Sequence, residues 1–273
     1  MPQTAYTREI RGEVVFLGTG TSVGVPSLGC GCRVCTSGHP RNQRTRCAIA
    51  IGLPEGNLLI DTPADLRSQL LREHIGIVHA VLYTHSHADH LFGLDDLRLF
   101  PFYLGHPVPL FCESNVERRI RHSYDYAFSD SPHTHPGAAP QLSIHSISLD
   151  PFRVLGVRVV PLRLQHGPRT QVLGFRIGDF AYCTDTNCIP DSSFERLAGV
   201  RTFVVDALRP SAHPTHFNVE QAVAAAQRVG AQRTYLTHSS HELDYEETNR
   251  QLPAGIEMAY DGMRVPINLD DAL

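Results

Sequence analysis

The chain has 273 residues, of which 42% are hydrophobic and 19% charged, with a formal net charge of −4, so it can bury one large core or two small ones. This slightly acidic charge, without any run of Lys and Arg, argues against nucleic acid as a partner, because nonspecific binding needs clustered positive charge. No segment reaches the roughly 18 to 20 consecutive apolar residues of a membrane span, and no N-terminal apolar run suggests a signal peptide, so we expect a cytoplasmic protein that does not bind a membrane.

Short apolar segments closed by Gly or polar residues predict four strands in the first third of the chain. They cover residues 13–18, 47–52, 57–61 and 79–84. The segment 61–74 predicts a helix, because a capping Asp61 or Thr62 is followed by Pro63 in the first turn and by leucines on one face.

The rest of the chain alternates between strand and helix patterns. Helices are predicted at 114–128, after Pro190 and at 218–230, where Asn218 is the cap, and a loop at 129–140. Strands are predicted at 141–149, 152–163, 171–178, 180–184, 202–208 and 233–238. This alternation predicts an α/β layered architecture, and no linker-like segment divides it, so we expect a single domain over residues 1–273.

Two predicted strands end in the same short pattern. AVLYTHSHADH (80–90) and RTYLTHSSHEL (233–243) each finish an apolar strand in Thr-His and continue with further histidines. This similarity suggests two related halves that present their strand ends to one shared site.

The densest group of metal-binding side chains is THSHADH at residues 84–90, in a chain with 16 histidines. In a tight turn that leaves a strand, His85 and His87 can point to one position while Asp89 and His90 point to a neighbouring one. That arrangement would supply imidazole and carboxylate ligands to two metal ions, which can share a bridging hydroxide and brace both the attacking and the leaving oxygen of a reaction. A His-rich polar loop without function is the weaker alternative, because four ligand-type residues lie within six positions.

His-x-His-x-Asp-His after a strand resembles the signature of the metallo-β-lactamase superfamily, and the resemblance extends over nearly the whole chain. The segment VVFLGTGTSVGVP (14–26) is similar to the opening strand and glycine loop of its phosphodiesterase and tRNA-processing branches, and Asp61 matches a structural aspartate. The resemblance implies an αββα sandwich with two metals at one edge, between the sheets. It implies that His85, His87 and His166 hold one metal and that Asp89, His90 and His238 hold the other, with Asp185 bridging them.

The residues themselves support two of these assignments. Asp185 ends the predicted strand 180–184, and a carboxylate can bridge two cations whereas an imidazole cannot. His166 follows a strand-like segment, and Gly167 allows a sharp turn directly after it.

Three of the seven cysteines, Cys30, Cys32 and Cys35, lie within SLGCGCRVCTSG (27–38). Clustered thiols in a reducing compartment favour a metal over a disulfide, but a structural zinc usually takes four ligands. His241 would complete a Cys₃His site for one structural zinc, with 27–38 as a zinc-binding loop insertion. Buried apolar thiols are the alternative. The other cysteines are predicted to be small buried hydrophobes: Cys47, Cys112, Cys183 and Cys188.

The cysteine insertion together with His241 resembles the PhnP type, whose members are phosphoribosyl cyclic phosphate phosphodiesterases. The resemblance implies a binuclear hydrolase with two divalent ions, Mn or Zn, in which a bridging hydroxide attacks a small phosphodiester, expected to be cyclic. Asp89 and His216 are the catalytic candidates. His216 matches the proposed general acid of the phosphodiesterase branch, although His213 can also supply the proton. We expect a homodimer.

Three other functions stay open. A tRNA 3′-end endonuclease shares the glycine loop and ligands, but such enzymes carry a long basic arm that this sequence lacks. A carbon-ester or lactone hydrolase is disfavoured by the resemblance of the cysteine insertion. A non-enzymatic accessory protein of the PQQ-biosynthesis type also carries a cysteine zinc cluster, although the intact ligand set, Asp89 included, favours catalysis.

Overall fold

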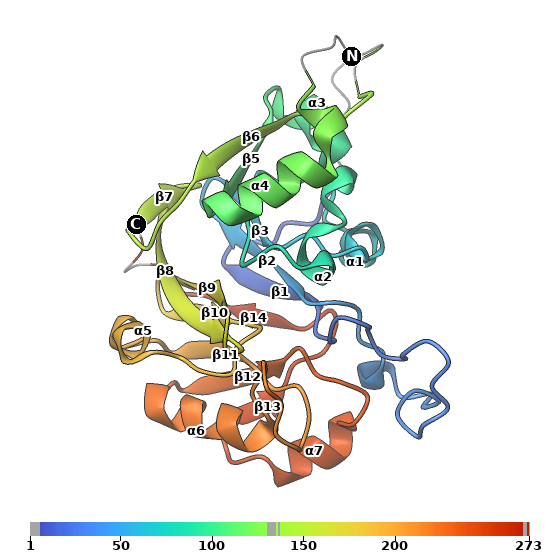
Figure 1. Cartoon of the computed structure of the whole chain (residues 1–273), viewed down its shortest axis with the longest axis vertical. Coiled ribbons are helices and arrows are strands. Elements are labelled where there is room, and N and C mark those ends of the chain that lie inside the picture. Colours follow the sequence, from blue (N-terminus) through green and yellow to red (C-terminus); the bar gives the residue numbers. More distant parts are fainter. Residues whose placement is uncertain (1–5, 130–134, 136, 270–271, 273) are drawn as a thin grey trace.

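The computed structural model describes residues 6–129, 135, 137–269 and 272. Two β-sheets pack against each other, and helices cover their outer faces (Figure 1). The strand orders are β14-β1-β2-β3-β4-β5-β6 and β13-β12-β11-β10-β9-β8-β7. The expected αββα sandwich is therefore confirmed.

The two sheets are built on the same plan, with an antiparallel half and a parallel half. Strands β3 to β6 of the first sheet and β10 to β13 of the second are parallel neighbours. The first sheet consists of β1 (Glu13–Gly18), β2 (Ala48–Leu53), β3 (Gly56–Ile60), β4 (Ala80–Leu82), β5 (Val108–Cys112), β6 (Leu142–Ser146) and β14 (Arg264–Pro266). The second consists of β7 (Phe152–Val154), β8 (Val157–His166), β9 (Thr170–Ile177), β10 (Phe180–Cys183), β11 (Thr202–Asp206), β12 (Arg233–Thr237) and β13 (Ile256–Met258).

Alternating side chains of the strands divide the core into layers. In β1, Val14 and Phe16 face the second sheet, where the Phe16 and Tyr235 rings lie 5.7 Å apart, whereas Val15 and Leu17 face the helical side. Both faces of the sheets are thus buried, which explains why the strands read as short continuous apolar runs.

Helices cover the outer face of each sheet. The helices are α1 (Leu66–Glu73), α2 (Ala88–Leu91), α3 (Phe100–Leu104), α4 (Ser114–Ser123), α5 (Asp191–Arg196), α6 (Val219–Val229) and α7 (Tyr245–Gln251). Short 3₁₀ turns lie at Pro40–Asn42, Leu94–Leu99 and Asp125–Ala127. Asn218 caps α6 as expected, in a reciprocal pair with Gln221. Among the described residues, no helix has the length and apolarity needed to cross a bilayer.

Several predicted elements differ from the structure. The helix expected from residue 61 begins at Leu66, because Asp61 is buried in the left-handed conformation with φ 66°. The strand expected over 152–163 is the hairpin β7–β8, since Leu155 and Gly156 both have positive φ and turn the chain. The helix expected over 114–128 ends at Ser123. Of the loop expected at 129–140, residues 130–134 and 136 lie outside the described residues.

Candidate metal centres

The candidate metal ligands lie at the carboxyl ends of strands from both sheets. His85 follows β4 of the first sheet, whereas His166, Asp185 and His238 end or follow β8, β10 and β12 of the second. The two Thr-His sequences, after β4 and β12, thus do meet at one place. Asp61, Asp185 and His238 adopt positive φ of 66°, 53° and 58°, a strained conformation that is concentrated at functional sites.

The structure brings the seven candidate ligands together in two adjacent groups. Nitrogen atoms of His85, His87 and His166 lie within 4.8 Å of one another. Ligand atoms of Asp89, His90, Asp185 and His238 form a second group within the same limit. These are the two sets expected from the sequence, and their binding of metal stays a prediction.

Asp185 lies between the two groups. One oxygen is 3.1 Å from Nε2 of His90, the other is 3.3 Å from Nε2 of His238, and the carboxylate also lies within 4.8 Å of His166. Its side chain is 2% exposed. This position suits a carboxylate that bridges two cations.

Neighbouring side chains fix which nitrogen of each histidine faces the centre. The Thr84 hydroxyl donates to Asp61 at 2.7 Å, so it accepts from Nδ1 of His85 at 2.9 Å. Asp61 also accepts from Nδ1 of His90 at 2.7 Å, and the Thr215 carbonyl accepts from Nδ1 of His166 at 2.9 Å. Each of these three imidazoles therefore presents Nε2 to the centre, as metal ligands with oriented partners do.

The buried polar atoms of the centre fit cations. Nε2 of His85, His90 and His238 has no hydrogen-bond partner among the described residues, although buried polar atoms are normally paired. Nε2 of His90 lies 3.1 to 3.3 Å from the carboxylates of Asp185 and Asp89 without hydrogen bonding to them. Two ligands that share one zinc-sized ion lie about 3.4 Å apart, so this spacing suits coordination.

The centre concentrates ionisable groups whose pKa values are displaced. Burial alone would lower the pKa of His238, but the Asp185 and Asp89 carboxylates raise it to about 9. Burial alone would also lower the pKa of His90. The carboxylates of Asp185, Asp89 and Asp61 have the larger, opposite effect and raise it well above its usual range. Burial and the charge of His90 lower the pKa of His85. Protons on His90 and His238 therefore supply positive charge that divalent cations would replace.

His216 lies over this centre and is held by a carboxylate. Its ring stacks on His238, with centroids 4.7 Å apart, and meets His166 edge to face at 4.7 Å. Nδ1 donates to Asp206 at 2.7 Å, which leaves Nε2 free for a ligand. Asp206 is not among the residues predicted from the sequence. It ends β11 as Asp185 follows β10, and an aspartate that closes an apolar strand is the sequence pattern that could have indicated it.

The three clustered cysteines and His241 form a separate group. Nδ1 of His241 is 3.3 Å from the Cys32 sulfur and 3.6 Å from the Cys30 sulfur, and Cys35 completes the set within 4.8 Å. Sulfur and nitrogen ligands of one tetrahedral zinc lie about 3.6 Å apart. The Cys35 amide, and then His241, lower the pKa of the Cys32 thiol to about 6, which favours the thiolate that zinc binds.

Buried contacts connect this cysteine cluster to the strand end that carries His238. Thr21 and Ser239 pair through their backbones, and the Arg44 guanidinium donates to the carbonyls of Ser240 and Leu243 at 2.9 and 2.7 Å. Arg44 is 2% exposed. The N-terminal loop and the segment after β12 therefore form one packed unit.

One of the other cysteine predictions is wrong. Cys47, Cys112 and Cys183 are buried as expected, but Cys188 is exposed. Cys188 follows β10 by five residues and lies in the loop before α5, where its backbone pairs with Gln165 while its side chain faces outward.

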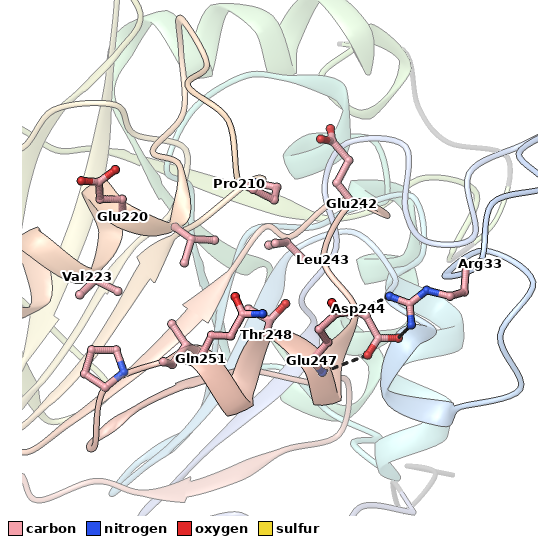
Figure 2. A pocket seen from close by; sticks show the side chains of 13 residues that line it. Arg33, Pro210, Glu220, Val223, Glu242, Leu243, Asp244, Glu247, Thr248 and Gln251 are labelled. Carbon is pink, nitrogen blue, oxygen red and sulfur yellow. Dashed lines mark hydrogen bonds and ion pairs between the residues drawn. The ribbon is translucent and has the colours of Figure 1, made fainter.

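A cavity of about 560 Å³ lies beside the cysteine loop, between α6 and α7 (Figure 2). Arg33 projects from the loop and makes ion pairs with Asp244 and Glu247 at its edge. The remaining charged lining residues are the acidic Glu220 and Glu242. An excess of carboxylates disfavours a phosphate, so this cavity is a poor site for an anionic substrate.

Comparison with known proteins agrees with the fold and the centre. Residues 56–239 match the Beta-lactamase superfamily domain, and the chain therefore belongs to the metallo-β-lactamase superfamily. The sequence is 40% identical to a solved structure described as a new diphosphatase from the PhnP family, which superposes with a TM-score of 0.88 over 94% of this chain and 97% of the other. Within the superfamily, this chain belongs to the PhnP family.

Two further relatives carry different names. An octanoyltransferase of Porphyromonas gingivalis is 37% identical over 93% of this chain, but the chain spans only 51% of that protein's length. Coenzyme PQQ synthesis protein B of Methylorubrum populi is 36% identical over 32% of this chain and 33% of its own length. Zinc-bound PqqB from Methylobacterium extorquens, at 19% identity, covers 93% of this chain and all of its own with a TM-score of 0.73, which supports the fold alone.

Proposed function

We propose that this hydrolase is a binuclear metal-dependent phosphodiesterase that cleaves a small, cyclic phosphodiester. The observation that carries the proposal is the set of buried Nε2 atoms of His85, His90 and His238, which have no hydrogen-bond partner among the described residues. Those of His90 and His238 lie 3.1 and 3.3 Å from the buried Asp185 carboxylate. Two divalent ions, Mn or Zn, would supply a nucleophilic hydroxide and neutralise charge that develops on the phosphate.

The chain's own residues then have distinct roles. His85, His87 and His166 would hold one ion, Asp89, His90 and His238 the other, and Asp185 both. His216 would donate the proton that a poor leaving alkoxide requires, and Asp206 would hold its ring in place and stabilise its protonated form. Within the part of the chain that the structure describes, no carboxylate forms a hydrogen bond or an ion pair with His213, so we assign the acid to His216.

A diphosphate is the second candidate substrate class, because the PhnP-family relative at 40% identity is described as a diphosphatase. A P–O–P linkage presents the same tetrahedral phosphorus to the centre as a diester does. The name octanoyltransferase does not carry over, since this chain covers about half of that relative.

The function is tested by an activity panel after reconstitution with Mn or Zn. It compares bis-p-nitrophenyl phosphate, ribose 1,2-cyclic phosphate, 2′,3′-cyclic nucleotides, ADP, pre-tRNA and a lactone. We expect hydrolysis of one or more of the three phosphodiester substrates that head the panel, and we expect this activity to be lost when the metal is chelated. Activity on the lactone alone, or no metal dependence, would overturn the proposal.

The cysteine cluster is proposed to hold a structural zinc. Replacing Cys32 with Ser is expected to remove one equivalent of zinc and to lower Tm by at least about 5 °C, while folded protein retains hydrolysis. Zinc content by mass spectrometry and Tm by calorimetry measure this. The control is Cys188→Ser, which removes an exposed thiol outside the cluster. Unchanged zinc content in Cys32→Ser would rule out the assignment.

Metal affinity is expected to rise with pH. Cations must displace protons from His90 and His238, whose pKa values lie above their ordinary range, that of His238 at about 9. Binding should therefore release protons and tighten by about tenfold per pH unit for each proton, between about pH 7 and about pH 9. Calorimetry in buffers of different ionisation enthalpy measures the protons released. An affinity independent of pH over that range would contradict the assignment.

We also propose a cytoplasmic homodimer that acts on a small substrate without nucleic acid. Light scattering of the purified protein tests the dimer, and a gel-shift titration with tRNA tests the exclusion of nucleic acid. A monomer, or salt-sensitive binding of tRNA, would contradict these expectations.

A further inference from the structure

The segment between β11 and α6 places a second histidine beside the proposed general acid. The His213 ring centroid lies 5.2 Å from that of His216. His213 is partly exposed, whereas the His238 ring on the other side of His216 is buried. His213 therefore lies further from the metal centre than His216 and closer to solvent.

This segment is held firmly in place. Asn187 donates to the Pro214 carbonyl at 3.0 Å, and His166 donates to the Thr215 carbonyl at 2.9 Å. Gly167 lies against Thr215, where a Cβ at position 167 would come within 2.7 Å of the Thr215 methyl carbon. Contacts with the metal-centre loops thus determine the position of His213 relative to the site.

Hydrogen bonds also fix the proton of His213. The Thr215 amide donates to Nδ1 of His213 at 3.4 Å, and the Thr215 hydroxyl lies 3.2 Å from the same nitrogen. An amide N–H can only donate, so Nδ1 is the acceptor and the neutral ring carries its proton on Nε2. That N–H has no partner among the described residues. His213 thus offers a hydrogen-bond donor next to the group that supplies the catalytic proton.

We propose that His213 is a specificity-determining residue for the second candidate class, the diphosphates, because it binds the phosphate of the leaving group. It would donate from Nε2 to one oxygen of that phosphate while His216 protonates another, the bridging oxygen. Two imidazoles with centroids 5.2 Å apart can contact two oxygens of one phosphate. This inference rests on the proposed function.

The chemical step balances without any further reactant. The oxygen of water bonds to the scissile phosphorus, and the bond from that phosphorus to the bridging oxygen breaks. The electron pair of the broken bond stays on the bridging oxygen, which takes the His216 proton, and the proton of the attacking water restores His216. A leaving group without a second phosphate undergoes the same step but lacks the contact with His213.

The test compares His213→Ala, His213→Gln and the control His122→Ala, which removes an exposed histidine on α4. The substrates are ADP, whose leaving group is a phosphate, and bis-p-nitrophenyl phosphate, whose leaving group is not. We expect His213→Ala to lose about 10- to 100-fold in kcat/KM on ADP, as for a hydrogen bond to a charged group, and less than about threefold on the other. His213→Gln, which keeps a terminal N–H donor, should recover most of the loss.

Binding supplies a readout that does not depend on turnover. Methylenediphosphonate should bind the His213→Ala enzyme about 10- to 100-fold more weakly than the wild type, while methylphosphonate binds both equally. Equal losses on both substrates would identify a structural role, and no loss would exclude the contact; either result overturns the inference. A wild-type enzyme that cleaves bis-p-nitrophenyl phosphate but not ADP refutes the inference alone. A wild-type enzyme that cleaves neither of these two substrates refutes the proposed function. In that case the binding of methylenediphosphonate to wild type and His213→Ala still tests the contact with His213.

Discussion

Replacing Asp185 with Asn is expected to lower hydrolysis of every phosphate substrate by more than about 100-fold and to remove metal from the centre. Changes to the partners of metal ligands already cost about 10- to 100-fold, and Asp185 would itself bind both ions. Asn keeps the shape of the side chain but removes the charge, so one cation at least would lose its shared anionic ligand. The effect should not depend on the leaving group.

The expected loss follows from the position of Asp185 in the centre. Its two oxygens lie 3.1 Å from His90 and 3.3 Å from His238, and Thr184 donates to it at 2.7 Å. The contacts with His90 and His238 raise the pKa of each imidazole and lower that of Asp185, although burial alone would raise the latter. The Asp185 side chain is only 2% exposed, so solvent water cannot easily take the place of its carboxylate in Asp185→Asn.

The measurement is metal content after gel filtration, together with kcat/KM on bis-p-nitrophenyl phosphate. Asp191→Asn is the matched control, because Asp191 is 84% exposed and pairs with Arg228 on the surface, away from the centre. Retention of both metals and of more than about a tenth of the activity in Asp185→Asn would show that it does not bridge.

Local spacing explains which parts of the centre the sequence predicts. His85, His87, Asp89 and His90 lie within one turn after a strand, so their proximity needs no knowledge of the fold. The assignment of His166, Asp185 and His238 depends on the resemblance, because the local signals at these strand ends are weak when each is taken alone. Their meeting depends on two sheets packing face to face, which no short segment encodes.

The groups that orient the ligands and His216 leave weak local patterns or none. Asp206 contacts His216 across ten residues of irregular chain, and Thr215 fixes His166 through its backbone carbonyl. A backbone contact leaves no residue-type signal. Thr84 begins the segment THSHADH, but its role in orienting His85 depends on its hydrogen bond to Asp61, which follows the neighbouring strand and lies 2.7 Å away.

The fold was predicted best where strands are long and central. Strands β5, β13 and β14 were missed, and the last two have three residues each at the edges of their sheets. Such short strands form because a neighbouring strand supplies backbone partners, and their own sequences give little periodicity. The turn at Leu155 was missed for a similar reason, since a leucine at φ 47° is rare.

His216→Ala is expected to slow hydrolysis by about 10²- to 10⁴-fold when the leaving group is an alkoxide, as for loss of a general acid. With p-nitrophenolate, which leaves without a proton, the rate should stay within a few-fold of the wild type. The dependence of kcat on leaving-group pKa, measured over a series of aryl and alkyl phosphodiesters, should therefore become steeper. Metal content should be unchanged, because the proposed ligands do not include His216.

Asp206→Asn separates the acid from its support. Asp206 accepts from Nδ1 of His216 at 2.7 Å and also from the Thr186 amide at 2.9 Å, so Asn keeps the shape of this contact but no longer stabilises the protonated ring. We expect a smaller loss than in His216→Ala, about 10- to 100-fold, and again only with poor leaving groups. The measurement is kcat over the same series of aryl and alkyl phosphodiesters. Equal losses of His216→Ala on alkoxide and nitrophenolate substrates would instead mean that His216 supports the metal centre, which its stacking on His238 also allows.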